Sequence, residues 1–192
     1  MKRIAIDMDE VIADTAGTHL EWYNRDYGDC VKPTDLNGTT LSQVRPERLK
    51  QIESYFDRDD FFRRLRVMEH SQDVIRELSE HYEIYIATAA MEVPASFSAK
   101  YEWLREHFPF LSDMRFVFCG EKSVINADYL IDDNVKQLRR FRGQGILYTA
   151  PHNIYESEHI RVNNWLEVRE LFLDKDRLAP LAAANRSAKE GE

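Results

Sequence analysis

The chain lacks paired cysteines and long apolar runs. Its two cysteines, Cys30 and Cys119, lie far apart and without metal-type spacing, so we expect two free thiols, as in a reducing compartment. No segment approaches the roughly 18 apolar residues that a membrane span needs. The N-terminus also shows no basic region followed by a long apolar stretch, so we expect no signal peptide. These absences favour a cytoplasmic protein without a membrane anchor.

The chain also lacks an excess of positive charge. It has 26 lysines and arginines against 34 aspartates and glutamates, a net charge of −8. Proteins that bind nucleic acid polymers are usually basic, so we expect no such partner. A small anionic ligand in one local pocket remains compatible with this charge. With 192 residues, 43% of them hydrophobic, the chain suits one domain with a modest insertion.

Short apolar runs alternate with segments of helical periodicity. We predict strands at 3–7, 84–87, 114–118, 129–131 and 145–149. We predict helices at 71–81, 96–107, 134–142 and 164–173. Alternating strands and helices indicate an α/β fold of Rossmann-like type, with a parallel sheet and helices on both of its faces.

One interval breaks this alternation. Roughly 60 residues separate the first two strands, far more than one crossover requires. Much of this interval has a helical pattern, so we predict a small α-helical cap inserted after the first strand, at residues 16–66. The core domain would then comprise residues 1–15 and 67–173. Residues 174–192 have the composition of a flexible C-terminal tail.

Polar residues follow several of the predicted strands. In a parallel sheet they would meet beyond the carboxyl ends of the strands, where such sheets bind ligands. These residues are Asp7, Asp9, Thr88, Lys122, Asp132 and Asp133. Four carboxylates in a partly dry site repel one another unless a cation lies between them. A hard divalent ion with oxygen ligands, Mg²⁺, satisfies this requirement.

Such a site suits phosphoryl transfer. A carboxylate beside Mg²⁺ can attack phosphorus and form an aspartyl-phosphate. A second carboxylate, two residues further along, can protonate the leaving oxygen and then activate water. Lys122 would offset the charge of the transferred phosphoryl group, and Thr88 would donate a hydrogen bond to it.

The motifs resemble those of the haloacid-dehalogenase-like (HAD-like) phosphatases. DMDEV matches their first motif, DxDx[VT], and Thr88, Lys122 and the Asp132–Asp133 pair resemble the second, third and fourth in the same order. Within that superfamily, "DMDEVIADT" is similar to DMDGVLADF of the 5′(3′)-deoxyribonucleotidases, and "KSVINADYLIDD" is similar to KTVVSADLLIDD. The resemblance implies a HAD-like fold with a helical cap and a phosphomonoesterase that acts on (deoxy)nucleoside monophosphates.

The resemblance also implies roles for residues. Asp7 would be the nucleophile and Asp9 the general acid and base. Mg²⁺ would be held by Asp7, by the backbone carbonyl of Asp9 and by Asp132 or Asp133, whose separate jobs the sequence does not apportion. Thr88 and Lys122 would bind the phosphate.

The chain departs from the deoxyribonucleotidase pattern at positions that surround the substrate. Glu10 replaces a glycine, Thr15 an aromatic residue, Ala89 a serine and Gly120 an arginine. The segment "DLNGTTLSQVRP" lacks the aromatic pair that stacks on the base in that family. A sugar phosphate or another small phosphomonoester is therefore an alternative substrate. A non-catalytic phosphate-binding module is disfavoured because both Asp7 and Asp9 are present.

The remaining expectations concern the surroundings of the site. Phe61, Phe62 and Ala89 are candidates for the substrate pocket, although core packing suits both phenylalanines equally well. Asp14 is expected to cap the first helix of the insert. Glu10 is expected to face solvent in a turn, with a place in the outer shell of the site as the alternative. The sequence leaves the oligomeric state open, with a homodimer as one assembly that the chain could form.

Overall fold

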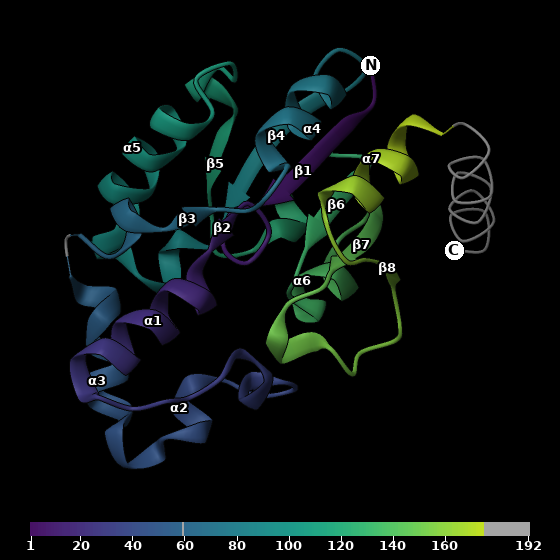
Figure 1. The fold of residues 1–192 in the computed structure, drawn as a ribbon. Helices are drawn as coiled ribbons and strands as arrows, with labels where there is room; N and C mark the ends of the chain where they lie inside the picture. Colours follow the sequence, from purple (N-terminus) through teal and green to yellow (C-terminus); the bar gives the residue numbers. More distant parts are fainter. Residues whose placement is uncertain (59, 175–192) are drawn as a thin grey trace.

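Six parallel strands form the sheet at the centre of the molecule (Figure 1). The computed structural model describes residues 1–58 and 60–174, so the predicted tail lies outside the described residues from position 175 onward. The strands of the sheet, in chain order, are β1 Arg3–Asp7, β4 Glu83–Thr88, β5 Phe116–Phe118, β6 Tyr129–Asp132, β7 Gln144–Tyr148 and β8 Ile160–Val162. Their spatial order is β5-β4-β1-β6-β7-β8, which confirms the predicted Rossmann-like α/β class.

The chain reverses its direction of travel across the sheet beside β1. It runs from β1 to β4 and β5 on one side, then returns to place β6 on the other side of β1, followed by β7 and β8. Ligands of open parallel sheets bind at such a switch point. Five of the six strands match predicted ones. β8 was missed because its three residues enclose Arg161 and give no apolar run.

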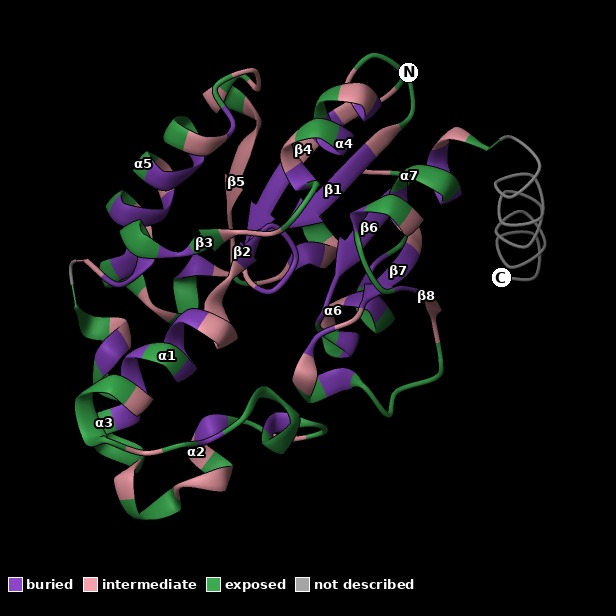
Figure 2. Ribbon diagram, viewed as in Figure 1, coloured by how far each residue is buried: buried purple, intermediate pink, exposed green. Residues whose placement is uncertain are grey.

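Helices cover both faces of the sheet, as predicted. The core helices are α4 Ser71–Leu78, α5 Phe97–His107, α6 Val135–Arg140 and α7 Trp165–Leu173. Side chains alternate along a strand, so Ile4 and Ile6 pack in one buried cluster, together with residues of α4, α5 and α7, while Ala5 packs in another with α6. Figure 2 shows the central strands of the sheet buried between the exposed outer surfaces of these helices, whereas the edge strand β5 is half-buried.

The segment predicted as the insert contains three α-helices among the described residues. They are α1 Thr15–Tyr27, α2 Leu41–Val44 and α3 Leu49–Glu53, and they lie beyond the end at which the strands finish (Figure 1). The chain enters the insert through β2 Ala13–Asp14 and leaves it through β3 Arg66–Val67, and these two short strands pair antiparallel. The ribbon β2–β3 thus holds the start and the end of the insert together. The exact domain boundaries remain predictions.

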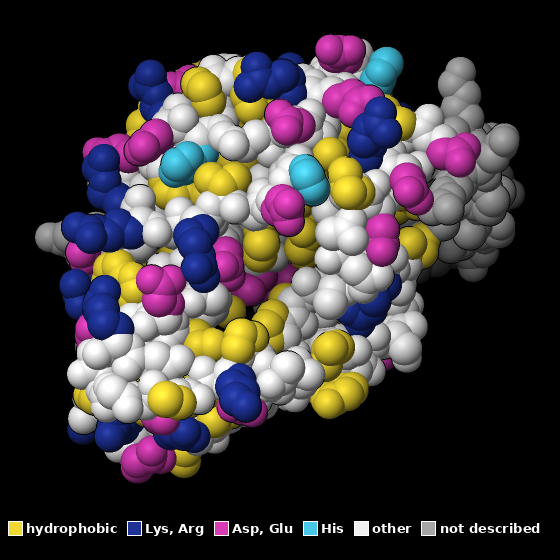
Figure 3. Space-filling view, viewed as in Figure 1, with side chains coloured by type: hydrophobic (Ala, Val, Ile, Leu, Met, Phe, Trp, Pro, Cys, Tyr) yellow, Lys and Arg dark blue, Asp and Glu magenta, His cyan; other side chains and the backbone are white. Residues whose placement is uncertain are grey.

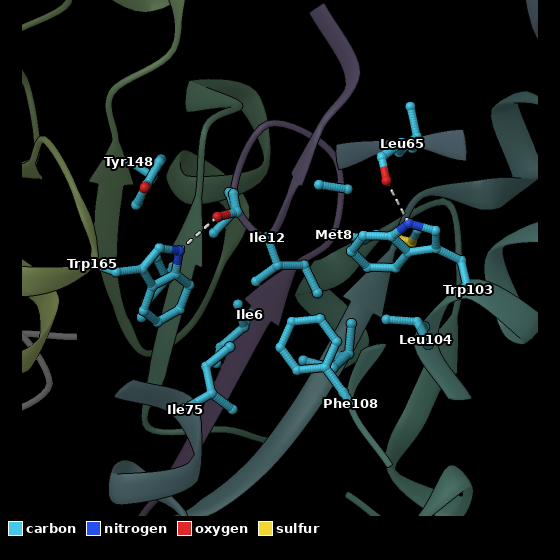
Figure 4. Packing of buried hydrophobic residues seen from close by; sticks show 14 of the residues in the cluster. Ile6, Met8, Ile12, Leu65, Ile75, Trp103, Leu104, Phe108, Tyr148 and Trp165 are labelled. Carbon is cyan, nitrogen blue, oxygen red and sulfur yellow. Dashed lines mark hydrogen bonds between the residues drawn. The ribbon is translucent and has the colours of Figure 1, made fainter. Parts of the chain in front are cut away.

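Two buried tryptophans fix the connections to this insert (Figure 4). Trp165 of α7 donates from Nε1 to the carbonyl oxygen of Val11, at 2.8 Å, just after β1. Trp103 of α5 donates from Nε1 to the carbonyl oxygen of Leu65, at 2.9 Å, just before β3. A buried indole needs a partner for its N–H, and here each partner is a backbone carbonyl of a connection between core and cap.

The expectation of free cysteines agrees with the described residues. Cys30 and Cys119 are both free, the first exposed and the second half-buried. Among the described helices, none has both the length and the apolar character to cross a membrane.

Candidate active site

The carboxyl ends of three neighbouring strands bring polar side chains together. Asp7 is the last residue of β1, Thr88 the last of β4 and Asp132 the last of β6, with Asp133 directly after it. Because β1 lies between β4 and β6, these residues meet at the switch point of the sheet. The backbone register of the sheet, rather than long side chains, therefore determines how far apart they lie.

A buried lysine lies between two of these aspartates. Lys122 Nζ is 2.5 Å from Asp7 Oδ1 and 2.6 Å from Asp132 Oδ2. Burial alone would lower the pKa of Lys122, but the two carboxylates outweigh it and raise the pKa above its usual range. Lys122 opens a single turn after β5, and Gln137 Oε1 accepts from its backbone N–H at 3.0 Å. The lysine is therefore fixed at both its backbone and its ammonium group.

Three carboxylates converge beside this lysine. One oxygen from each of Asp7, Asp132 and Asp133 lies within 4.8 Å of the others, and all three residues are buried. Burial raises the pKa of Asp7 to about 7, although Lys122 opposes this rise. Burial also raises the pKa of Asp133 well above its usual value, and the charges of Asp7 and Asp132 add to the effect. One lysine does not neutralise three carboxylates, so the site has room for another positive charge.

The donor set fits a hard divalent cation. All three candidate ligands are carboxylate oxygens, the type that Mg²⁺ prefers. Asp7 Oδ1 is buried and lies 2.5 Å from Lys122 Nζ, an ammonium group that it shares with Asp132. Because buried charge is costly unless it is paired, a further cation beside Asp7 and Asp133 would offset the remaining negative charge.

Asp132 and Asp133 have different surroundings. Asp132 is fully buried and accepts hydrogen bonds from Lys122 Nζ and, at 2.8 Å, from the backbone N–H of Asn134. Asp133 keeps 7% of its surface exposed, and its Oδ2 lies 3.4 Å from His152 Nε2. His152 also lines the cavity described below.

A second buried lysine holds Asp9. Lys100 Nζ donates to Asp9 Oδ2 at 2.5 Å and to Thr88 Oγ1 at 3.2 Å. The hydroxyl of Thr15, in the first turn of α1, donates to the other oxygen, Asp9 Oδ1, at 3.1 Å. The Thr88 hydroxyl lies 3.5 Å from Asp9 Oδ2. Asp9 is therefore oriented jointly by the core and by the first helix of the cap.

Lys100 was not predicted as part of the site. The residue lies on α5, outside the strand-end motifs, and its side chain is 5% exposed. A signal was present: Lys100 falls at helical spacing with Trp103 and Leu104, on the buried face of α5. A cation on the apolar face of an amphipathic helix needs a buried partner, which points to a carboxylate nearby.

The aspartates and lysines line a cavity of about 390 Å³ between the core and the cap. Figure 3 shows acidic side chains in a hollow of the surface in this region. Of the residues predicted for the site, the cavity is lined by Asp7, Asp9, Phe62, Ala89, Lys122, Asp132 and Asp133. Thr88 is fully buried and does not line it. Its hydroxyl instead contacts Asp9 and Lys100.

The two predicted phenylalanines differ in position. Phe62 lines the cavity together with Phe56, whose ring is stacked at an interplanar angle of 28°. Phe61 is fully buried and packs edge-on against Trp22 and Phe56, so the structure gives it the packing role that was the alternative. Phe56, which the sequence analysis did not single out, contributes the apolar surface that was sought at Phe61.

Glu10 does not face solvent, and that prediction was wrong. The residue is 9% exposed, and its carboxylate accepts from the backbone N–H of Ala16 at 2.5 Å. Its backbone adopts φ 60°, the left-handed conformation, which folds the turn back toward α1. This conformation is favourable for glycine, the residue that the deoxyribonucleotidase pattern has at this position. Burial raises the pKa of Glu10 to about 8.

Asp14 caps α1, as predicted. Its carboxylate accepts from the backbone N–H of Gly17 at 2.9 Å and also binds Arg66 of β3 at 2.9 Å. Asp14 and Glu10 thus satisfy two of the N–H groups that the first turn of a helix leaves without partners.

A second cavity, of about 310 Å³, adjoins the first. The two share Thr15, Thr40, Phe56 and His152 as lining residues. The loop of the cap that borders it is tied to the core, because the backbone N–H of Gly38 donates to the carbonyl oxygen of Pro151 at 2.8 Å. Together the cavities offer a polar end beside the aspartates and an adjoining space for the rest of a ligand.

The sequence as a whole is similar to that of known proteins. The family model described as 5′ nucleotidase, deoxy (pyrimidine), cytosolic type C protein matches residues 1–178. A Bacillus subtilis protein named 5′(3′)-deoxyribonucleotidase is 40% identical over 172 residues, which cover 90% of this chain and 99% of that protein. A Staphylococcus aureus protein, to which the same name is provisionally given, is 53% identical over 175 residues, covering 90% and 96%.

The fold is similar to that of solved structures. A HAD-family hydrolase of Deinococcus radiodurans, with bound phosphate and sodium, matches with a TM-score of 0.63 at 12% identity, over 93% of this chain and 98% of that one. A haloacid dehalogenase-like hydrolase of Streptococcus pneumoniae matches with a TM-score of 0.58 at 15% identity, over 90% and 98%. At such low identity these matches establish the HAD-like fold.

Proposed function

The chain belongs to the family of 5′ nucleotidase, deoxy (pyrimidine), cytosolic type C proteins, and from this premise we propose that it is a Mg²⁺-dependent 5′(3′)-deoxyribonucleotidase. The proposed reaction is the hydrolysis of a (deoxy)nucleoside monophosphate to a nucleoside and inorganic phosphate. Relatives that carry this name at 40–53% identity support the assignment. No nucleic acid polymer is expected as a partner, and a homodimer is one assembly to be tested.

One observation carries the chemical part of this proposal. Three buried carboxylates, Asp7, Asp132 and Asp133, converge within 4.8 Å of one another beside Lys122 at the switch point of a parallel sheet. A structural ion pair would need fewer acidic groups, because each additional buried carboxylate costs free energy. Such an excess of acceptors suits a site that binds a cation together with an anionic substrate.

The first step of the proposed mechanism uses Asp7 as the nucleophile. Its carboxylate oxygen attacks phosphorus, the bond from phosphorus to the ester oxygen breaks, and an aspartyl-phosphate forms on Asp7. Asp9, in its protonated form, donates its proton to the departing alkoxide. Lys122 and Lys100 offset the negative charge of the phosphoryl group.

The second step regenerates the enzyme. Asp9, now a carboxylate, accepts a proton from water, and the water oxygen attacks phosphorus and releases inorganic phosphate from Asp7. Thr15 and Lys100 hold the two oxygens of Asp9, so the same carboxyl group is oriented for both proton transfers. Thr88 supports this orientation from the end of β4.

The proposed cofactor is Mg²⁺, held by Asp7, the Asp9 backbone carbonyl, Asp132 and Asp133. When bound, it would neutralise charge on the phosphoryl oxygens and orient the phosphate toward Asp7. The role of Lys122 would be to keep Asp7 and Asp132 in place, since it contacts both.

The nucleoside would occupy the cavity between core and cap. Phe56 and Phe62 offer an apolar surface on the cap side, and the adjoining cavity extends the available space. We propose that residues 16–66 act as the cap, excluding bulk water and contributing specificity, and that residues 1–15 and 67–173 form the core.

A sugar phosphate or another small phosphomonoester is a second candidate substrate. The observation that favours it is the absence of a stacking pair from the segment "DLNGTTLSQVRP", of which only Thr40 lines the larger cavity. The chemistry would be the same, and only the leaving group would differ.

Phosphate release by the purified protein tests these proposals. Deoxyribonucleotides, ribonucleotides, sugar phosphates and p-nitrophenyl phosphate would be compared with Mg²⁺ and with a chelator. Activity concentrated on deoxyribonucleoside monophosphates, and lost with the chelator, is the expected result. Activity spread over sugar phosphates would keep the mechanism and change the substrate. A preparation in which Asp7→Asn retains full activity would instead indicate a contaminant and a non-catalytic binding module.

A further inference from the structure

Asn153 makes four hydrogen bonds beside the candidate metal site. The residue ends a single turn, Pro151–Asn153, that follows β7, and it is 2% exposed. Its Nδ2 donates to the carbonyl oxygens of Asp133 and Tyr148, both at 2.8 Å. Its Oδ1 accepts from the backbone N–H of Ala150 at 3.2 Å and from Arg161 Nη1 at 3.0 Å. The side chain thus connects the loop after β6 with the loop after β7 and with β8.

These four bonds use the whole capacity of an amide. The two hydrogens on Nδ2 and the two lone pairs of Oδ1 each have one partner. A rotation of the amide by half a turn would place its oxygen against two carbonyl oxygens and its NH₂ group against two donors. Only one orientation of Asn153 is therefore compatible with its surroundings, and this orientation fixes the Asp133 carbonyl.

Arg161 holds Asn153 from the outside. Besides the bond from Nη1 to Asn153 Oδ1, its Nη2 donates to the backbone oxygen of Asn153 at 2.9 Å and also to that of Glu156. Nη1 donates in addition to Thr149 Oγ1 at 3.0 Å. The planar guanidinium therefore fixes both the side chain and the backbone of Asn153, which a flexible ammonium group would do less well.

The backbone carbonyl that Asn153 holds is that of Asp133, whose side chain is one of the three converging carboxylates. Asp133 lies between two fixed points: the backbone N–H of Asn134 donates to Asp132 Oδ1 on one side, and Asn153 holds the Asp133 carbonyl on the other. Asp133 lies beyond the last sheet residue, Asp132, so no strand pairing fixes its backbone. Its carboxylate nevertheless lies within 4.8 Å of the other two.

We propose that Asn153 is a positioning residue for Asp133 as a metal ligand, and that Arg161 acts through Asn153. This inference rests on the proposed Mg²⁺ site. Mg²⁺ requires near-ideal octahedral geometry, so a small rotation of one carboxylate weakens its binding. Ca²⁺ accepts irregular geometry and is expected to tolerate the same rotation better. The hydrogen bonds of Asn153 and Arg161 therefore set both the affinity of the site for Mg²⁺ and its preference for Mg²⁺ over the larger Ca²⁺.

Calorimetric titration of the full-length protein with Mg²⁺ and with Ca²⁺ tests this inference without relying on activity. In Asn153→Ala and Asn153→Asp we expect the affinity for Mg²⁺ to fall about tenfold, as is typical when a residue behind a metal ligand is removed. The affinity for Ca²⁺ should fall by about threefold or less, because its coordination is more flexible. Arg161→Lys should weaken Mg²⁺ binding by a smaller factor, about threefold.

Asn24→Ala is the matched control. Asn24 also bridges a loop with its amide, donating to the carbonyl oxygen of Val31 at 2.8 Å and accepting from its N–H at 3.1 Å. It lies on α1 in the cap, and its removal should leave Mg²⁺ affinity unchanged within about twofold. Arg169→Lys, which alters an exposed ion pair with Glu77, is the corresponding control for Arg161→Lys.

The possible results distinguish the positioning role of Asn153 from the existence of the metal site. Folded Asn153 variants that bind Mg²⁺ as the wild type does would overturn the proposal, and so would equal losses for Mg²⁺ and Ca²⁺. If the Asn153 variants fail to fold, Arg161→Lys decides in the same way, since it retains the charge and Asn153 itself. A wild-type protein that binds no Mg²⁺ would instead refute the metal site on which the inference rests.

Discussion

The two buried lysines of the site have differently built surroundings. Lys122 contacts two carboxylates at strand ends, Asp7 and Asp132, whose side chains are 8% and 0% exposed. Lys100 contacts one carboxylate, Asp9, whose side chain is 29% exposed, and its other partner is the Thr88 hydroxyl. The first lysine lies among fixed groups of the sheet, and the second lies where the core meets the cap.

This difference matches the two kinds of chemistry proposed for the site. A nucleophile and a metal cluster require fixed distances, which paired strands provide through their backbone register. A general acid and base must exchange protons with substrate and water, so partial exposure suits Asp9. Its contact with Thr15 of α1 also makes its orientation depend on the position of the cap.

The largest expected effect comes from Asp7→Asn, on the Lys122 side. Asparagine cannot form the acyl phosphate, so the turnover number should fall on the order of 10⁴-fold or more. Phosphate release from the preferred deoxyribonucleotide measures this loss. Retention of even a hundredth of the activity would contradict the assigned nucleophile.

The same substitution should change how the stability of the metal-free protein depends on pH. The folded-state pKa of Asp7 is raised by burial to about 7, against an unfolded value of about 3.9. The folded state therefore binds more protons between these values, and the free energy of unfolding should decrease as pH rises from about 4 to about 7. Urea titrations in a chelator should show a weaker decrease in Asp7→Asn than in the wild type.

Asp9→Asn, on the Lys100 side, should have the next largest effect. Loss of general acid catalysis should lower turnover of a deoxyribonucleotide about 10³-fold. With p-nitrophenyl phosphate the first step should suffer much less, because its leaving group needs no proton. A burst of p-nitrophenol in rapid mixing would reveal this, and the absence of a burst would argue against proton donation by Asp9.

Substitution of each lysine by methionine tests how much each lysine contributes to the free energy of unfolding. Lys122→Met leaves two buried carboxylates without their cation and should lower the free energy of unfolding by about 3 kcal/mol. Lys100→Met leaves a partly exposed carboxylate and should cost about 1 kcal/mol. Urea denaturation measures both, with the exposed Lys136→Met as a control within about 0.5 kcal/mol of the wild type. Equal losses of unfolding free energy in Lys122→Met and Lys100→Met would show that the surroundings of the two lysines do not differ in this way.

The smallest effect is expected at Glu10, which supports the cap side. Glu10→Ala loses the hydrogen bond to Ala16 and keeps a side chain in the left-handed conformation, whereas Glu10→Gly relieves that strain. Glycine should therefore be more stable than alanine at this position by about 1 kcal/mol. The reverse order in urea midpoints would show that the turn changes shape when the carboxylate is removed.

The parts of the molecule that the sequence predicts well are those with local signals. Short apolar runs marked five strands, and their ends placed Asp7, Asp132 and Asp133 together because parallel strands finish at one edge. The position of Lys122 after the predicted strand at 114–118 placed it near the same edge. The resemblance to a family added roles that the spacing could not supply.

The parts that were missed depend on tertiary contacts. Lys100 lies on a helix, twelve positions beyond Thr88, and reaches Asp9 from there. Its place on the buried face of that helix is the one sequence signal of this contact. Glu10 has an ordinary polar sequence context, and its burial follows from a left-handed turn that brings it to Ala16. Arg161 of β8 reaches Asn153 in the turn after β7, and neither position carries a sequence pattern of its own.

The position of β1 has a consequence for synthesis of the chain on the ribosome. This central strand is made first, yet its partner β6 follows far later, since Arg3 donates its backbone N–H to Asp128, 125 residues along the chain. At ordinary translation speeds the wait lasts roughly 6–25 s. One edge of an apolar strand stays unpaired for that time, so the nascent chain is a natural client for chaperones. The proposed nucleophile, Asp7, is made before the other candidate site residues, and the candidate site is complete only after Asp133 has been added.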